Sequence, residues 1–325
     1  MKHLDVGYTN GVIAAREKYL LKDKLIRLCE LSAEDAFRAL LDSGFGGGAE
    51  TTTSVYEYEK LVTEEEARID EFIKEYSPSN VEYTYLLCNR DFHNAKALVK
   101  AKILNVEADR MLAPQGLMEI EKIRSAVASG DIKTLQEENE ILADAIAQAL
   151  ALEDEASGVK IGEIFENALY SYLYETVKRK SILRNLLIAK ADMTNILTAI
   201  RSENQETAQT KYLKIGSLQN KTLDSLFLDD REKAESAFKG TPYESFVKKC
   251  LDAKAKGVPP TEAEKIRDGY DAVFFEQRKY ELIKNEPFLY YVYRRRLESA
   301  NVRIIFVCLL AGLSETDVKK RLRAW

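Results

Sequence analysis

Three short motifs pair an acid with an asparagine and are the part of the sequence best suited to polar chemistry. The asparagines lie 101 and 106 residues apart. On a helix, side chains three residues apart share one face, where an acid and an amide can hydrogen-bond as a pair. The acid and amide positions are Asp91 and Asn94, Asp192 and Asn195, and Glu298 and Asn301.

A partial copy of the motif opens the chain at Tyr8-Thr9-Asn10, with Gly7 where the other copies carry the acid. A cation follows the asparagine by six positions in three copies, and in the copy at Asn301 that place is Val307. The cations are Arg16, Lys100 and Arg201, and the nearest cation to Asn301 is Arg303.

These polar groups have three readings. They fix the register of packed helices as buried polar pairs, or they line a central socket and bind an inserted partner helix. The third reading is a set of catalytic carboxylates, which requires a base or a metal ligand beside them. The sequence offers neither at a suitable spacing, so catalysis is the least favoured reading.

Nucleotide and histidine chemistry have little support. The glycine-rich run 44–48 is followed by Ala49, Glu50 and Thr51, without the lysine that a phosphate-binding loop requires, so we expect a flexible loop between helices. The histidines are His3 and His93, and we expect His93 to be a surface or packing residue. We predict no catalytic residues, no cofactor site and no metal site.

Composition indicates long helices. The 325 residues are 46% hydrophobic and 31% charged, which excludes a disordered chain, and the net charge of −5 disfavours nucleic acid as the main ligand. Glycine (15) and proline (6) are too scarce for the many turns of an all-β fold. Cys29, Cys88, Cys250 and Cys308 lie far apart and predict reduced thiols in the cytosol.

Apolar residues recur every three or four positions over most of the chain, between breaks rich in Gly, Pro, Ser and Asn. One predicted break spans residues 158–162. Ser32 with Asp35, and Ser314 with Asp317, have the spacing of helix N-caps. The longest apolar stretch, 304–313, is about half the roughly 20 residues that a membrane span requires, so we expect the chain not to cross a membrane.

A period near 100 residues exceeds that of ordinary helical repeats. It predicts an all-α chain of three similar helical-bundle domains, at residues 1–112, 113–216 and 217–325.

Two clusters have open interpretations. The tyrosines near positions 170–174 and 290–293 suit helix packing or a protein interface. Arg294, Arg295 and Arg296 form either a solvated face or a contact with acidic partner helices or lipid headgroups.

Taken in order, the motif copies, together with Pro114-x-Gly116, resemble the C/d subunit family of V-type ATPases over the whole chain. The resemblance implies a funnel-like protein of three domains around a pseudo-threefold axis. It also implies a non-catalytic subunit that couples the central shaft to the membrane proteolipid ring, on the cytoplasmic face of the membrane, without binding nucleotide itself. The alternative is a freestanding helical adaptor that binds partner helices.

Overall fold

The computed structural model describes residues 5–48, 53–152 and 156–323, and the secondary structure in these ranges is helical, with no strand, as the sequence predicts. The chain divides into two compact units. Unit 1 combines residues 1–82 with 260–325, and unit 2 comprises residues 83–259. The expected domain boundaries near 113 and 217 both fall inside unit 2, and the division into three similar domains stays a prediction.

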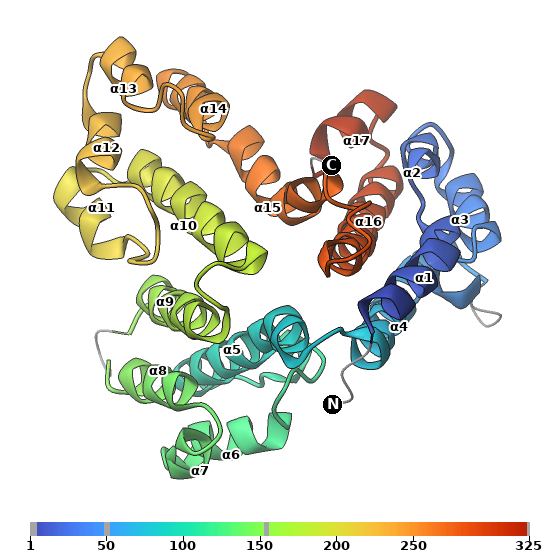
Figure 1. Cartoon of the computed structure of the whole chain (residues 1–325), viewed down its shortest axis with the longest axis horizontal. Helices are drawn as coiled ribbons and strands as arrows, with labels where there is room; N and C mark the ends of the chain where they lie inside the picture. Colours follow the sequence, from blue (N-terminus) through green and yellow to red (C-terminus); the bar gives the residue numbers. More distant parts are fainter. Residues whose placement is uncertain (1–4, 49–52, 153–155, 324–325) are drawn as a thin grey trace. The chain divides into compact units, whose positions relative to one another are not determined.

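Unit 1 is organised around one long helix, α16 (Glu286–Leu310), which contacts the other helices of the unit (Figure 1). These helices are α1 (Val6–Arg16), α2 (Asp23–Leu28), α3 (Ala33–Asp42), α4 (Tyr58–Tyr76), α15 (Thr261–Glu276) and α17 (Glu315–Arg321).

Local sequence explains where several of these helices begin. The Ser32 hydroxyl accepts a hydrogen bond from the Asp35 amide at 3.1 Å and begins α3, and Ser314 does the same for Asp317 at 3.3 Å and begins α17. Each bond satisfies an amide that has no partner inside the helix. Both predicted N-caps are confirmed.

The core of unit 1 joins segments from the two ends of the sequence. Phe306 of α16 packs edge-on against Phe37 of α3, with ring centroids 6.2 Å apart, and stacks on Tyr58 of α4 at 5.3 Å. Leu25, Leu40 and Val318 are fully buried in the same cluster. Because burial of apolar surface is the main stabilising force, this cluster holds the two distant stretches as one body.

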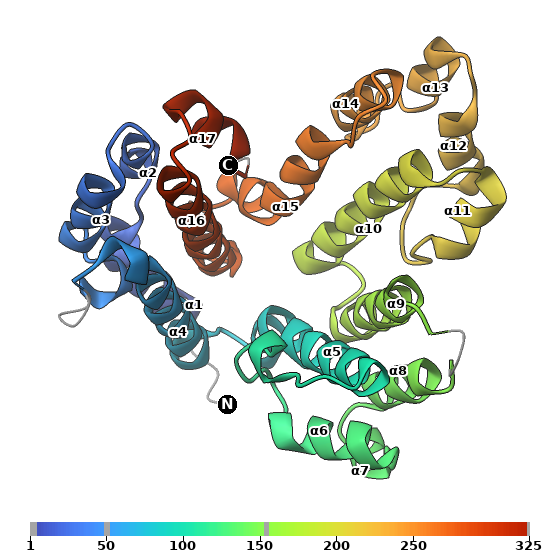
Figure 2. The same ribbon diagram turned by 180° about the vertical axis from the view of Figure 1, so that it is seen from behind.

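Unit 2 contains two long helices, α5 (Asn80–Leu104, of which residues 80–82 belong to unit 1) and α10 (Ile182–Arg201) (Figure 2). Its other helices are α6 (Ile120–Ser129), α7 (Lys133–Gln136), α8 (Glu140–Leu150), α9 (Gly158–Thr176), α11 (Gln205–Lys211), α12 (Asn220–Asp224), α13 (Arg231–Ala237) and α14 (Glu244–Ala255). One hydrophobic cluster packs α5 against α6, α8 and α9, and α10 contacts α9, α11, α12 and α14.

The break predicted at residues 158–162 was wrong. Helix α9 begins at Gly158, where the hydroxyl of Ser157 caps the Lys160 amide at 3.1 Å, and Gly162 lies inside the helix. A glycine inside a helix costs only about 1 kcal/mol, which the burial of Ile161 and Phe165 beside it outweighs. In the described ranges, no helix is both long enough and apolar enough to span a bilayer.

Candidate functional site

The motif on α5 binds the segment that follows the helix. The Asp91 carboxylate accepts hydrogen bonds from the amides of Leu117 at 3.0 Å and Met118 at 3.3 Å. The Asn94 side chain donates to the Ala113 carbonyl at 3.2 Å and accepts from the Ala113 amide at 2.8 Å. We call this arrangement a clasp: the acid holds two consecutive amides, and the asparagine pairs with both backbone groups of one residue.

A second clasp lies on α10. Oδ1 of Asp192 accepts from the amides of Ser217 at 2.7 Å and Leu218 at 3.0 Å. Asn195 pairs with both backbone groups of Leu213, at 3.0 and 2.7 Å. The other carboxylate oxygen, Oδ2 of Asp192, accepts from the hydroxyls of Ser217 at 2.6 Å and Tyr243 at 2.8 Å.

The third clasp, on α16, joins two segments that are far apart in sequence. Glu298 accepts from the amides of Leu21 at 2.9 Å and Lys22 at 3.0 Å. Asn301 pairs with both backbone groups of Arg323, donating at 3.4 Å and accepting at 2.9 Å. The helix therefore holds the N-terminal and C-terminal segments of unit 1 together.

None of the six clasp side chains is more than 2% exposed. The sequence suggested that the acid and the asparagine bond to each other. The hydrogen bonds described above run instead from each of them to backbone groups of connecting segments, and Asp192 also accepts from the hydroxyls of Ser217 and Tyr243. Buried backbone amides and carbonyls need such partners, because an unpaired one is costly.

Burial also changes the acidity of two of the carboxyl groups. It raises the pKa of Asp91 to about 6, although the amides of Met118 and Leu117 oppose the shift. It also raises the pKa of Glu298, against the amides of Leu21 and Lys22 and the charge of Arg294. In both cases desolvation of the charged form is the largest cause.

A glycine lies against each of the first two clasps. A Cβ added at Gly116 would lie 2.4 Å from Oδ1 of Asp91, and one added at Gly216 would lie 2.7 Å from Oδ1 of Asp192. Only glycine allows the backbone to approach the carboxylate this closely. Gly116 stood out in the sequence through its Pro-x-Gly context, whereas Gly216 was missed; its signal is a similar distance from the motif asparagine.

The partial copy in α1 makes a different contact. Nδ2 of Asn10 donates to the carbonyls of Leu282 at 2.7 Å and Lys284 at 3.1 Å. Asn10 thus holds the loop before α16 through two carbonyls, where the other motif asparagines hold an amide and a carbonyl.

The four cations that follow the motif asparagines lie in different environments. Arg16 lies over the rings of Phe72 and Tyr76, at 5.1 and 4.9 Å, and the Lys100 ammonium lies beside Gly158 at the start of α9. Arg201 is exposed at the end of α10. Arg303 binds α16 to α4 through Glu59 at 2.8 Å and Glu66 at 3.2 Å.

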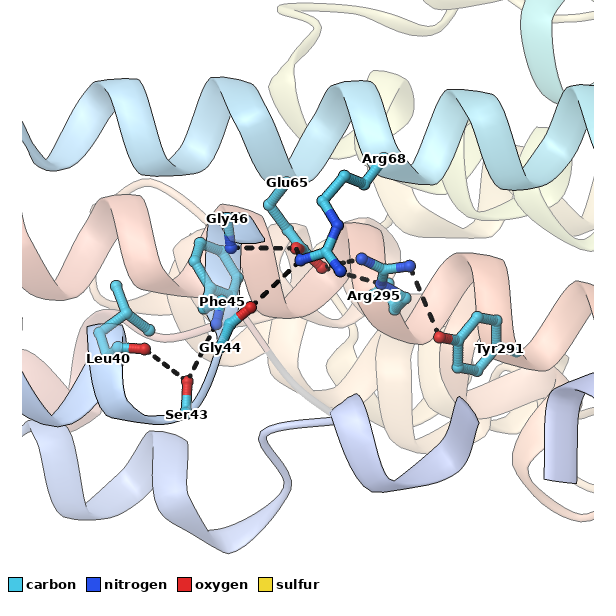
Figure 3. Close-up of polar contacts among 9 residues, drawn as sticks. All are labelled: Leu40, Ser43, Gly44, Phe45, Gly46, Glu65, Arg68, Tyr291 and Arg295. Carbon is cyan, nitrogen blue, oxygen red and sulfur yellow. Dashed lines mark hydrogen bonds and ion pairs between the residues drawn. The ribbon is translucent and has the colours of Figure 1, made fainter. Parts of the chain in front are cut away.

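Arg295, at the centre of the arginine run 294–296, lies neither on a solvated face nor on a surface open to a partner. Arg295 is 6% exposed, and its Nε donates to Glu65 of α4 at 2.8 Å; Tyr291 lies beside it (Figure 3). Arg294 lies 3.5 Å from Glu298. The interpretation as a solvated face was therefore wrong for Arg295, because a carboxylate on another helix compensates its buried charge.

The glycine-rich run at 44–48 binds Glu65, the partner of Arg295, as well. The Gly46 amide donates to the other Glu65 oxygen at 3.2 Å, and the Gly44 carbonyl accepts from Arg68 at 3.1 Å (Figure 3). Gly46 has φ +61°, and a Cβ there would lie 2.6 Å from the Leu61 carbonyl. The loop thus lies packed on α4, and its amide binds a carboxylate of the protein itself. The following residues, 49–51, and His3 lie outside the described ranges.

His93, the histidine within the described ranges, contacts a backbone carbonyl. Nε2 of His93 lies 3.0 Å from the Met111 carbonyl at an exposed position. Within the described part of the chain, no group of three or more His, Cys, Asp or Glu side chains has a metal-binding arrangement. The chemical role of the clasps is to bind backbone amide and carbonyl groups.

Comparison with known proteins identifies the family. A family model described as ATP synthase (C/AC39) subunit matches residues 9–321. The C subunit of the V-type sodium ATPase of Enterococcus hirae is 22% identical over 324 residues, which cover 97% of each chain. The chain belongs to the ATP synthase (C/AC39) subunit family, the family of V-type ATPase C/d subunits that its motifs resemble.

Proposed function

We propose that this protein is the non-catalytic central-stalk subunit that couples the rotating shaft of a V-type ATPase to its membrane proteolipid ring. The observation that carries the proposal is the family match over residues 9–321. The relative of nearly equal length, named as the C subunit of a sodium ATPase, supports it. The partners are then the shaft subunits and the ring, and the location is the cytoplasmic face of the membrane.

The clasps suit such a mechanical role. A coupling subunit must pass torque through non-covalent contacts without slipping, so its connecting segments must not slide along its long helices. Hydrogen bonds between a buried carboxylate and backbone amides are among the strongest that a protein makes. We therefore favour the register-fixing role for the acid and asparagine residues over direct partner binding, because they already hold segments of their own chain.

The arrangement of three similar domains around a pseudo-threefold axis belongs to this proposal as well. Its support is the motif spacing and the repetition of one clasp geometry on α5, α10 and α16. Neither nucleotide binding nor a cofactor is part of the proposed role.

Affinity isolation of the tagged chain from its native membranes tests the proposal. We expect shaft and proteolipid subunits to follow the chain in mass spectrometry. Stripping the chain from the complex should leave ATP hydrolysis intact while abolishing ion transport, and adding it back should restore transport. Recovery of neither partner from membranes that contain an intact ATPase would refute the coupling role and favour the freestanding adaptor.

A further inference from the structure

The loop between α9 and α10, residues 177–181, carries three cations in a row (Figure 1). Lys178, Arg179 and Lys180 are all exposed, and Arg184 follows in the first turn of α10. We call these four residues the α9–α10 basic cluster. Over residues 175–184 the charged groups are these four cations and one exposed acid, Glu175, so the segment has a net charge of +3 in a chain whose net charge is −5.

The cluster differs from other basic runs of the chain, because acids of the same protein do not compensate its charge. Arg295, in the arginine run of α16, donates to Glu65 at 2.8 Å. Lys319, in the basic run of α17, pairs with Glu30 at 2.8 Å. Within the described ranges, no acid forms an ion pair with residues 178–180. Their charge is therefore available to a partner from outside the chain.

Hydrogen bonds order the turn that carries the cluster. The Lys178 carbonyl accepts from the amide of Ser181 at 3.0 Å and from its hydroxyl at 2.8 Å. The Arg184 guanidinium lies over the ring of Tyr174, 3.3 Å from the ring centroid, and donates to the Tyr174 carbonyl at 2.8 Å. These contacts hold the backbone between α9 and α10 in one conformation, which lowers the entropic cost of bringing the cations to a surface.

The segment offers charge but little apolar surface. Val177 and Leu183 are each 2% exposed and Ile182 is half-buried, so no apolar side chain of the described segment 175–184 is exposed. The core of a protein–protein interface is apolar and poor in charged residues. The shaft and the ring are both proteins, and this segment lacks such a core for either of them. The acidic net charge of the chain disfavours nucleic acid.

Anionic lipid headgroups require no apolar core. Clusters of about four to eight Lys and Arg side chains bind anionic bilayers through charge, because a bilayer surface presents many phosphates without a fixed geometry. We propose that the α9–α10 basic cluster binds the surface of an anionic lipid bilayer. The inference goes beyond the proposed function, whose partners are the shaft and the ring, and it does not depend on that function.

The test compares two triple variants of the full chain. In the first, the three loop cations become glutamine: Lys178→Gln/Arg179→Gln/Lys180→Gln. In the control, three exposed lysines on α7, on α12 and at the end of α14 become glutamine: Lys133→Gln/Lys221→Gln/Lys256→Gln. Each variant loses three positive charges, so the net charge changes from −5 to −8 in both and only the position of the lost charge differs. Circular dichroism and thermal unfolding should match the unmodified chain, because the substituted side chains are exposed.

Binding is measured by co-sedimentation with protein-free vesicles of phosphatidylcholine, with and without phosphatidylglycerol. We expect the unmodified chain and the control to bind the anionic vesicles, to bind the neutral vesicles far more weakly, and to lose their binding at high salt, which screens charge. Each cation near an anionic bilayer contributes roughly fivefold to the binding constant, so the first variant should bind at least about tenfold more weakly than the control.

Equal binding of the first variant and the control, or no binding of the unmodified chain to anionic vesicles, would overturn the inference and leave the proposed function standing. A parallel titration uses membrane sector in neutral detergent, stripped of this chain. If the first variant loses that binding while the unmodified chain does not bind vesicles, the cluster recognises an acidic protein surface, which also overturns the inference. Failure of the unmodified chain to bind the membrane sector would refute the proposed function, while the vesicle result would still decide the inference.

Discussion

The clasp on α10 makes a sharp prediction for Gly216→Ala. The added Cβ would lie 2.7 Å from Oδ1 of Asp192 and 2.9 Å from Nδ2 of Asn195, closer than carbon contacts in folded proteins. Oδ1 is the atom that accepts from the amides of Ser217 and Leu218. The methyl group therefore displaces the oxygen on which two charge-assisted hydrogen bonds depend.

The expected cost follows from those two bonds. A hydrogen bond to a charged group contributes about 1.5–3 kcal/mol, so losing both costs about 3–6 kcal/mol. Replacing glycine by alanine also restricts the unfolded chain, which returns about 0.4–1 kcal/mol. We expect a net loss of about 2–5 kcal/mol in the free energy of unfolding, measured by urea denaturation followed by circular dichroism at 222 nm.

The matched control is Gly162→Ala, inside α9, where an added Cβ has no atom within 4 Å. This substitution should stabilise by about 1 kcal/mol, because alanine is the better helix former. In an Asp192→Ala background, the cost of Gly216→Ala should fall by at least about 1.5 kcal/mol, since the displaced oxygen is gone. A Gly216→Ala protein as stable as the unmodified chain would refute the clasp as a stabilising contact.

Three further predictions concern charged groups. The pKa of folded Asp91, about 6, exceeds its ordinary value of 3.8. The stability that this shift contributes is therefore complete below pH 3.8 and is lost as the pH rises through 6. Relative to Asp91→Asn, the unmodified chain should lose about 2–3 kcal/mol in the free energy of unfolding between pH 4 and 7, measured by urea titrations. Glu65→Met should cost about 3–5 kcal/mol in stability, because it leaves Arg295 buried without its partner. The double variant Glu65→Met/Arg295→Met should recover more than half of this loss, and a double variant as unstable as Glu65→Met alone would contradict the pairing. Arg303→Ala should cost less than about 1 kcal/mol, because its partners are solvated, and a larger loss that persists in 1 M salt would contradict this.

Much of the fold was predictable because its signals are local. Apolar periodicity and the scarcity of Gly and Pro indicate helices, and a hydroxyl three residues before an acid, as at Ser32 and Ser314, indicates where a helix begins. The error at Gly162 has the opposite cause. Helix propensity is a weak local preference, and the tertiary packing of α9 overrides it.

The motif positions were predictable, but the partners of their side chains were not. Repetition marked Glu298, yet its partners Leu21 and Lys22 are 277 and 276 residues away, and they contribute backbone amides, which every residue but proline carries. Side-chain identity therefore leaves no trace of these contacts in a single sequence. Glycines at similar distances after Asn94 and Asn195 were the one readable sign that a backbone comes close.

The buried pair of Arg295 and Glu65 was hidden for a different reason. A run of three arginines reads as solvated, because most cations are exposed. What buries Arg295 is its place on α16 opposite α4, together with a carboxylate 230 positions away. Every residue of α16 from Glu286 to Val292 is buried, so most faces of this helix lie against other helices, and a cation within it depends on a partner from one of them.

The departure of the first motif copy from the others has a structural explanation. In the clasps on α5 and α10, one continuous segment supplies both the residue held by the asparagine and the amides held by the acid. In the clasp on α16 that segment is divided: Arg323 supplies the first part, and Leu21 and Lys22 supply the second. The segment that follows α1 is thus already held by Glu298, so an acid at position 7 would lack these amides as partners. As a consequence, the clasp on α16 is completed by two separate segments and not by one continuous one, so its hydrogen bonds add to the hydrophobic cluster that holds the two stretches of unit 1 together.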